Sequence, residues 1–111
     1  MNLSFEKKGD KLIVHMIGEL DHHSAEEVRN KVDNRLETEG YNKLIMDFSG
    51  VTFMDSSGIG VVIGRYKKLS LKKGKIYITR VSGSVKRVFE LSGMFKIIPM
   101  FESIENALDN M

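Results

Sequence analysis

The chain of 111 residues contains no cysteine and only one proline. Without cysteine it can form neither a disulfide scaffold nor a metal site built on thiolates, which fits a reducing compartment. Low-complexity stretches are also missing, so the sequence indicates no linker and no disordered tail. We therefore expect a single domain that spans residues 1–111.

The sequence also lacks a long hydrophobic run. Its longest uninterrupted stretch of apolar and glycine residues, 58–64, is far shorter than the roughly 18 residues needed to cross a membrane. Residues 1–8 have no apolar centre of the kind found in signal peptides. We expect a cytoplasmic protein that does not associate with a membrane.

Charge is unevenly distributed along the chain. Residues 1–55 carry seven basic and eleven acidic side chains, whereas residues 56–111 carry ten basic and four acidic ones. The basic residues fall mainly on predicted helix surfaces, where they either face solvent or form a docking surface for an acidic protein partner. Direct nucleic-acid binding is not indicated, because no interleaved aromatic residues or recognition motif accompany the charge.

Hydrophobic spacing predicts alternating strands and helices. Apolar residues that alternate on both sides of a turn at 7–10 indicate an N-terminal hairpin. The rest of the pattern predicts further strands and helices: strands at 44–48, 75–79 and 95–98, and helices that begin near Ser24, Ser56, Ser84 and Ser103. The resulting order, β-β-α-β-α-β-α-β-α, is typical of an α/β fold. We expect a mixed, mostly parallel sheet of four to five strands, with an antiparallel hairpin and about four helices.

Local signals predict the ends of the helices. The segment Ser24–Glu27 has the form of a capping box, in which a serine and a glutamate satisfy each other's N–H groups. Gly40 and Gly93 are placed to end the first and third helices. The helix from Ser56 is expected to continue to about Lys73.

The most informative segment joins the strand at 44–48 to the apolar helix that follows it. It reads Asp55-Ser56-Ser57-Gly58, so two hydroxyl groups stand where a helix presents free N–H groups and the positive end of its dipole. Such a position accommodates negative charge, including a phosphate. The same residues also fit a simple N-cap, because Asp and Ser are preferred there.

A second polar loop contains Asp21, His22 and His23 and follows the neighbouring strand. In an open α/β sheet, functional loops lie at the carboxyl ends of the strands. We therefore expect Asp21 and Ser56 to meet on a common rim of the sheet.

Two catalytic interpretations of this rim fit the sequence poorly. Ser56 lacks the G-x-S-x-G pattern of a hydrolase nucleophile. Asp21, His22 and His23 lack the spacing of metal ligands, because adjacent side chains diverge. We expect no enzymatic activity and no metal, and a regulated binding surface fits better.

The glycines of the second helix have two possible roles. Gly58, Gly60 and Gly64 loosely resemble a dinucleotide-binding loop, but no acidic residue ends the next strand. Glycine inside a helix costs about 1 kcal/mol relative to alanine. We therefore expect Gly60 and Gly64 to let the helix pack closely on the sheet or on a partner, with no cofactor bound.

Three segments together resemble the family of anti-sigma factor antagonists, which are single STAS domains. They are 18–26 with its Asp-His-His sequence, 53–67 with Asp-Ser-Ser-Gly and Gly-Arg-Tyr-Lys, and 85–98. The first two favour the sporulation branch of the family, the anti-sigma F factor antagonists.

This resemblance implies a partner-switching function without catalysis by this chain. In the family, the unphosphorylated antagonist binds an anti-sigma factor that is also a serine kinase, and thereby frees the sigma factor. The kinase phosphorylates the antagonist, which stops this binding, and a serine phosphatase reverses the modification. By resemblance the phosphoacceptor is Ser56. The implied partner-binding residues are Asp21, His22, Asp55, Ser56, Ser57, Gly58, Ile59, Gly60 and Arg65.

Two alternatives stay open. The chain fits a small ligand- or nucleotide-binding STAS module that uses the same rim. It also fits an antagonist for a stress-response sigma factor, which differs only in the identity of the partner.

Overall fold

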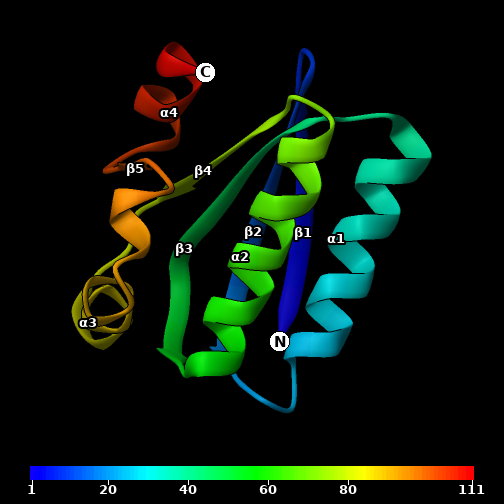
Figure 1. The fold of residues 1–111 in the computed structure, drawn as a ribbon. Coiled ribbons are helices and arrows are strands. Elements are labelled where there is room, and N and C mark those ends of the chain that lie inside the picture. Colours follow the sequence, from blue (N-terminus) through cyan, green and yellow to red (C-terminus); the bar gives the residue numbers. More distant parts are fainter.

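The computed structural model describes residues 1–111 as one five-stranded sheet with helices packed on it (Figure 1). The elements follow one another as β1 (Asn2–Lys8), β2 (Lys11–Leu20), α1 (Ala25–Glu39), β3 (Lys43–Met54), α2 (Ser56–Leu71), β4 (Lys75–Thr79), α3 (Gly83–Ser92), the 3₁₀ turn η1 (Met94–Lys96), β5 (Met100–Phe101) and α4 (Ile104–Asn110). The strands lie in the order β1-β2-β3-β4-β5, with β1 and β2 antiparallel and all other neighbours parallel. The predicted fold class is confirmed. No helix has the length and apolar character that a membrane span requires.

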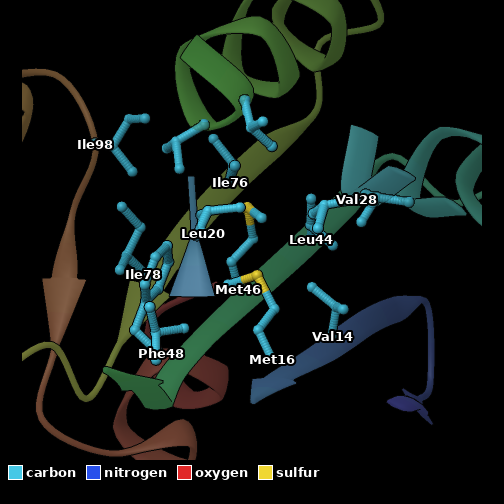
Figure 2. Packing of buried hydrophobic residues seen from close by; sticks show 14 of the residues in the cluster. Val14, Met16, Leu20, Val28, Leu44, Met46, Phe48, Ile76, Ile78 and Ile98 are labelled. Carbon is cyan, nitrogen blue, oxygen red and sulfur yellow. The ribbon is translucent and has the colours of Figure 1, made fainter. Parts of the chain in front are cut away.

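The main core lies between the sheet and helices α1, α2 and α3. Alternate residues of β2 and β3, such as Val14 and Met46, face this side and are fully buried (Figure 2). Helix α1 contributes Val28 to the same cluster, and α3 contributes Phe89, whose ring meets Phe48 edge to face at 5.2 Å. Because strand side chains alternate between faces, these contacts place the three helices in one layer.

The opposite face of the sheet is covered only in part, by α4. Ala107 of this helix packs against Ile13 and Ile45 in a small separate cluster. Two residues further along the same strands stand His15 and Asp47, which pair with each other in the register of β2 and β3. This face is therefore apolar under α4 and polar beyond it.

A buried carboxylate on β3 organises the polar part of this face. Asp47 is 1% exposed and accepts two hydrogen bonds from the Arg80 guanidinium, at 2.8 and 2.9 Å, and one from the Thr79 hydroxyl at 3.0 Å. The His15 ring lies between Asp47 and Glu6, 3.0 and 3.1 Å from their carboxylate oxygens. Desolvation opposes ionisation of Asp47, but its hydrogen bonds, above all those from Arg80, lower its pKa to about 2. The cluster thus links β1, β2, β3 and the end of β4.

The helices predicted to begin near Ser24 and Ser84 begin within one residue of these positions, but the predicted capping box is wrong. The Ser24 hydroxyl donates to the Glu19 carbonyl at 2.7 Å and makes no cap hydrogen bond, so no capping box with Glu27 forms. Helix α3 begins at Gly83, so its N-cap residue is Ser82 and Ser84 lies inside its first turn.

The last predicted strand is displaced along the chain. Residues 95–98 do not pair with the sheet, because 94–96 form η1 and β5 begins only after Pro99. The apolar side chains that suggested a strand are used differently: Met94 and Ile98 are buried in the main core from a turn. The Pro99 carbonyl then accepts a hydrogen bond from the Ile78 N–H at 3.0 Å and starts the pairing of β5 with β4.

Candidate functional site

The two polar loops lie next to each other at one edge of the sheet. Strands β2 and β3 run parallel and remain paired to their last residues, Leu20 and Met54. The loop with Asp21 follows the first strand and the Asp55–Ser56 junction follows the second. The common rim expected from the sequence is present. We call it the rim, formed by residues 21–23 and 55–60.

Asp55 connects both halves of the rim. It is the N-cap of α2, and its carboxylate accepts a hydrogen bond from the Ser57 N–H at 2.8 Å. The other carboxylate oxygen accepts one from the His22 N–H at 3.3 Å, and the Asp55 N–H donates to the Leu20 carbonyl at 3.4 Å. One side chain therefore caps the helix and holds the opposite loop against it.

Ser56 is the first residue of α2 and is exposed to solvent. Because Asp55 caps the helix, the Ser56 hydroxyl is not needed for capping and makes no hydrogen bond within the protein. It stands beside the positive end of the helix dipole, free for chemical modification. The alternative that Ser56 serves as the N-cap is thus wrong.

The Asp21 loop is ordered by its own carboxylate. Asp21 accepts hydrogen bonds from the N–H groups of His23 at 2.9 Å and Ser24 at 3.1 Å. Partial desolvation opposes ionisation, but the hydrogen bonds from Ser24 and His23 outweigh it and lower the pKa of Asp21. The rim therefore carries two negative charges near Ser56, at Asp21 and Asp55.

Both rim histidines are exposed, and their ring centroids lie 5.6 Å apart. No group of three His, Asp or Glu side chains in the protein is arranged to hold a metal ion. His22 takes part in the rim through its backbone N–H, which sequence patterns do not reveal.

The helix glycines have different roles. A Cβ atom on Gly58 would collide with the Met54 side chain and lie 2.9 Å from the Leu20 carbonyl oxygen. Gly58 therefore lets the first turn of α2 lie directly on the ends of β2 and β3. At Gly60 and Gly64 a Cβ atom would meet nothing within 4 Å, so the expected close packing of these two glycines on the sheet is wrong.

Arg65 does not lie on the rim. Its side chain is buried between α1 and α2, with Nε 2.9 Å from Asp33 Oδ1. The distance is that of an ion pair, but neither atom forms a well-directed hydrogen bond. Burial lowers the pKa of Arg65, and the charge of Asp33 opposes this effect. We leave Arg65 out of the contact surface, because it joins two helices.

The structure adds two features to the rim that the sequence analysis missed. Phe53, two residues before Asp55, is 45% exposed. A pocket of about 330 Å³ beside the rim is lined by Glu19, Asp21 and Glu27. The side of the rim that carries Asp21 is therefore acidic, and an exposed aromatic ring precedes Asp55 by two residues in the chain.

The comparisons with known proteins agree with this geometry. The family model of the STAS domain matches residues 2–107. A Paenibacillus polymyxa protein named anti-sigma F factor antagonist is 37% identical over 113 residues, which cover 100% of this chain and 97% of that protein. A Listeria monocytogenes protein named anti-sigma-B factor antagonist is 32% identical, over 88% of each chain.

Solved structures of SpoIIAA have the same fold. The anti-sigma factor antagonist SpoIIAA in its unphosphorylated form aligns with a TM-score of 0.77 at 29% identity, over 98% of this chain and 96% of that chain. The phosphorylated form of the Bacillus protein aligns with a TM-score of 0.76 at the same identity, over 98% of each chain. The chain belongs to the STAS domain family and, within it, to the anti-sigma factor antagonists.

Proposed function

We propose that this protein binds an anti-sigma factor that is also a serine kinase, and that phosphorylation of Ser56 ends this binding. The chain itself would be the substrate and would catalyse nothing. A separate serine phosphatase would remove the phosphate and restore binding. The switch would operate in the cytoplasm, where transcription takes place, without direct contact to nucleic acid.

The observation that carries this proposal is the unused hydroxyl of Ser56. It is exposed at the first position of α2, where the free N–H groups of the helix accommodate a phosphate. The neighbouring Ser57 is half-buried, and its N–H is bound to the Asp55 carboxylate. A kinase can therefore reach Ser56 without unfolding the helix.

The charges of the rim explain how a phosphate would change binding. A phosphoserine adds about −1.5 to −2 charges at neutral pH. Asp21 and Asp55 already carry negative charge on the rim, so the phosphate would add like charge and bulk to the docking surface. The fold would survive, because the helix N-terminus tolerates the added charge. The partner would be released by a local change.

The proposed contact surface consists of the rim residues. They combine two carboxylates, one exposed and one half-buried serine, and one half-buried apolar side chain: Asp21, His22, Asp55, Ser56, Ser57, Gly58, Ile59 and Gly60.

The identity of the sigma factor is proposed from the relatives. The relative named for the F factor is 37% identical over the whole chain, and the one named for the B factor is 32% identical over 88% of it. We therefore favour the sporulation sigma factor over a stress-response sigma factor. Gly58, Gly60 and Gly64 line none of the surface pockets, so no observation favours nucleotide binding at the glycines.

The test is peptide mass spectrometry after incubation with the cognate anti-sigma kinase and ATP. We expect one phosphate, on Ser56, and none on the Ser56→Ala variant. Efficient phosphorylation of that variant at Ser57 would contradict the assignment. If the wild-type chain gained no phosphate from a kinase that is active on another substrate, the proposed phosphorylation switch would be contradicted.

A further inference from the structure

The edge of β4 is only partly paired. The register of β4 with β5 contains just two pairs, Ile78 with Met100 and Thr79 with Phe101. Residues Lys75, Ile76 and Tyr77 therefore face no strand on this side, although all three pair with β3 on the other.

The hydrogen bonds of β4 alternate between its two neighbours. The Lys75 N–H donates toward β3, to the Asn42 carbonyl at 2.9 Å, whereas the Ile78 N–H donates toward β5 at 3.0 Å. In a regular strand, groups two residues apart point to the same side. The N–H and C=O of Ile76 thus point to the side of β5 and have no strand partner there.

Pro99 explains why the pairing stops. If the parallel register continued, Ile76 would pair with residue 98, and its C=O would receive the N–H of residue 99. Proline has no N–H to donate, so β5 cannot extend in this direction. The unpaired edge is built into the sequence.

A groove lies along this unpaired edge. Its volume is about 340 Å³, and its walls include Tyr66 from α2, Tyr77 from β4 and Pro99. Ile76 is one of its lining residues, and the residue as a whole, backbone included, is 3% exposed. The groove therefore offers one backbone donor and one backbone acceptor between apolar and aromatic walls.

The mouth of the groove is positively charged. Lys75 lines it, and Lys72 and Lys73 lie in the turn that leads into β4. All three are exposed and none makes an ion pair within the protein. Lys73 has a φ of 57°, in the left-handed region that Gly40 and Gly93 occupy after α1 and α3. The chain thus places a lysine where glycine is the favoured residue.

We propose that this groove, defined by Tyr66, Ile76, Tyr77 and Pro99, binds a short extended acidic segment of a protein partner. The segment adds a strand beside Ile76, donates an N–H to its carbonyl and accepts its N–H. Acidic side chains of the segment meet Lys72 and Lys75. Strand addition at an exposed sheet edge is a known mode of peptide recognition. The site lies at the amino end of β4, away from the rim, and does not depend on the phosphorylation of Ser56.

The test is a titration of the ¹⁵N-labelled protein with a blocked hexapeptide of alternating glutamate and valine. We expect saturable amide shifts centred on Ile76 and Tyr77, with no comparable shifts at residues 55–60. A peptide of the same sequence with N-methylated backbone nitrogens should bind at least about threefold more weakly, because it cannot donate to the Ile76 carbonyl.

Charge variants distinguish binding at the groove from nonspecific electrostatic attraction of the acidic peptide to a basic protein. Lys72→Gln with Lys75→Gln should weaken binding about threefold or more, whereas Lys86→Gln with Arg87→Gln on α3 should leave it unchanged. The proposal is overturned if the N-methylated peptide binds equally well, if both variants lose affinity alike, or if no shift occurs at Ile76. Shifts at Ile76 that depend on the concentration of the protein alone would assign the groove to a second copy of this chain and overturn the proposed partner.

Discussion

At the scale of single residues, the hydrogen bonds of Asp55 determine what Ser56 can do. Asp55 satisfies the Ser57 N–H at 2.8 Å, so the hydroxyl of Ser56 is left without a structural role. The same carboxylate reaches the His22 N–H at 3.3 Å and fixes the Asp21 loop. Asp55 thus holds the rim together, and its neighbour Ser56 is left available for the proposed phosphorylation.

Asp55→Ala should lower stability by about 0.5–2 kcal/mol, as expected for loss of an N-cap. Asp55→Asn should restore most of this loss, because asparagine also caps well. Chemical denaturation of both variants measures the difference. Amide exchange at His22 should accelerate in the alanine variant, since its acceptor is gone. Equal stability of all three proteins would show that the observed cap contributes nothing.

Ser56→Asp should keep the fold but weaken binding to the anti-sigma kinase by about tenfold or more, which corresponds to about 1.4 kcal/mol. The reason is the added charge beside Asp21 and Asp55. Isothermal titration calorimetry measures the affinity, and circular dichroism confirms the fold. Ser56→Ala is the matched control and should bind like the unphosphorylated protein. If Ser56→Asp bound the kinase as tightly as the wild type, the proposal that added negative charge releases the partner would be contradicted.

At the scale of elements, the first turn of α2 must lie directly on the ends of two strands. Gly58 makes this approach possible, because the Leu20 carbonyl and the Met54 side chain leave no room for a Cβ atom. The position of Ser56 therefore depends on how closely this turn approaches the sheet. Gly60, two residues further along the helix, faces open space.

Gly58→Ala and Gly60→Ala should change stability in opposite directions. The first should destabilise by about 1–3 kcal/mol, because a packed region must move apart. The second should stabilise by up to about 1 kcal/mol through helix propensity. Thermal or urea denaturation of the two variants distinguishes them. If both substitutions had the same sign, the contact at Gly58 would not control the packing of α2.

Elements with strong periodicity were predictable from the sequence, whereas β5 was not. Helix α2 was predicted from Ser56 to about Lys73 and extends from Ser56 to Leu71, whereas β3 was predicted over 44–48 from a nearly continuous apolar run and extends from Lys43 to Met54. Residues 95–98 are apolar except for Lys96, but Phe95 and Ile98 reach the core from a turn, and only Pro99 marks where pairing with β4 begins. A four-residue segment with three apolar residues does not distinguish a strand from a turn of 3₁₀ helix.

At the scale of the whole molecule, the two faces of the sheet are stabilised differently. One face is covered by three helices through apolar contacts, and the other depends partly on the hydrogen bonds of Asp47. Arg80 adopts a φ of 56°, in the left-handed region, at the end of β4, where its guanidinium forms two of those hydrogen bonds. The polar cluster thus links the strands on the part of this face that lies beyond α4.

The Asp47 cluster predicts a defined pH dependence. The pKa of Asp47 falls from 3.8 to about 2 on folding, so the folded state favours the ionised form. Its stabilisation is therefore fully present above about pH 4 and is lost as the pH falls toward 2, an effect of about 2 kcal/mol. Urea denaturation of the wild type and Asp47→Asn between pH 2 and 7 should show a difference that shrinks in this window.

Asp10 provides the control for this prediction. Its pKa is also lowered to about 2, chiefly by hydrogen bonds from Lys43 and Lys11, but its side chain is 61% exposed. Exposed ion pairs contribute little to stability. Asp10→Asn should therefore have a much smaller effect than Asp47→Asn at every pH. Equal effects would mean that burial does not strengthen the Asp47 cluster.

The sequence by itself determined the order of strands and helices, the parallel sheet, and the position of Ser56 where a strand passes into a helix. These features depend on local spacing and on the chemistry of neighbouring residues. Only the tertiary structure decided that Asp55 caps the helix, that Arg65 is buried against Asp33, and that Asp47 meets Arg80. The last two contacts join residues far apart in the chain, and their geometry follows from how helices and strands pack; the cap is local, but the sequence left open whether Asp55 or Ser56 forms it.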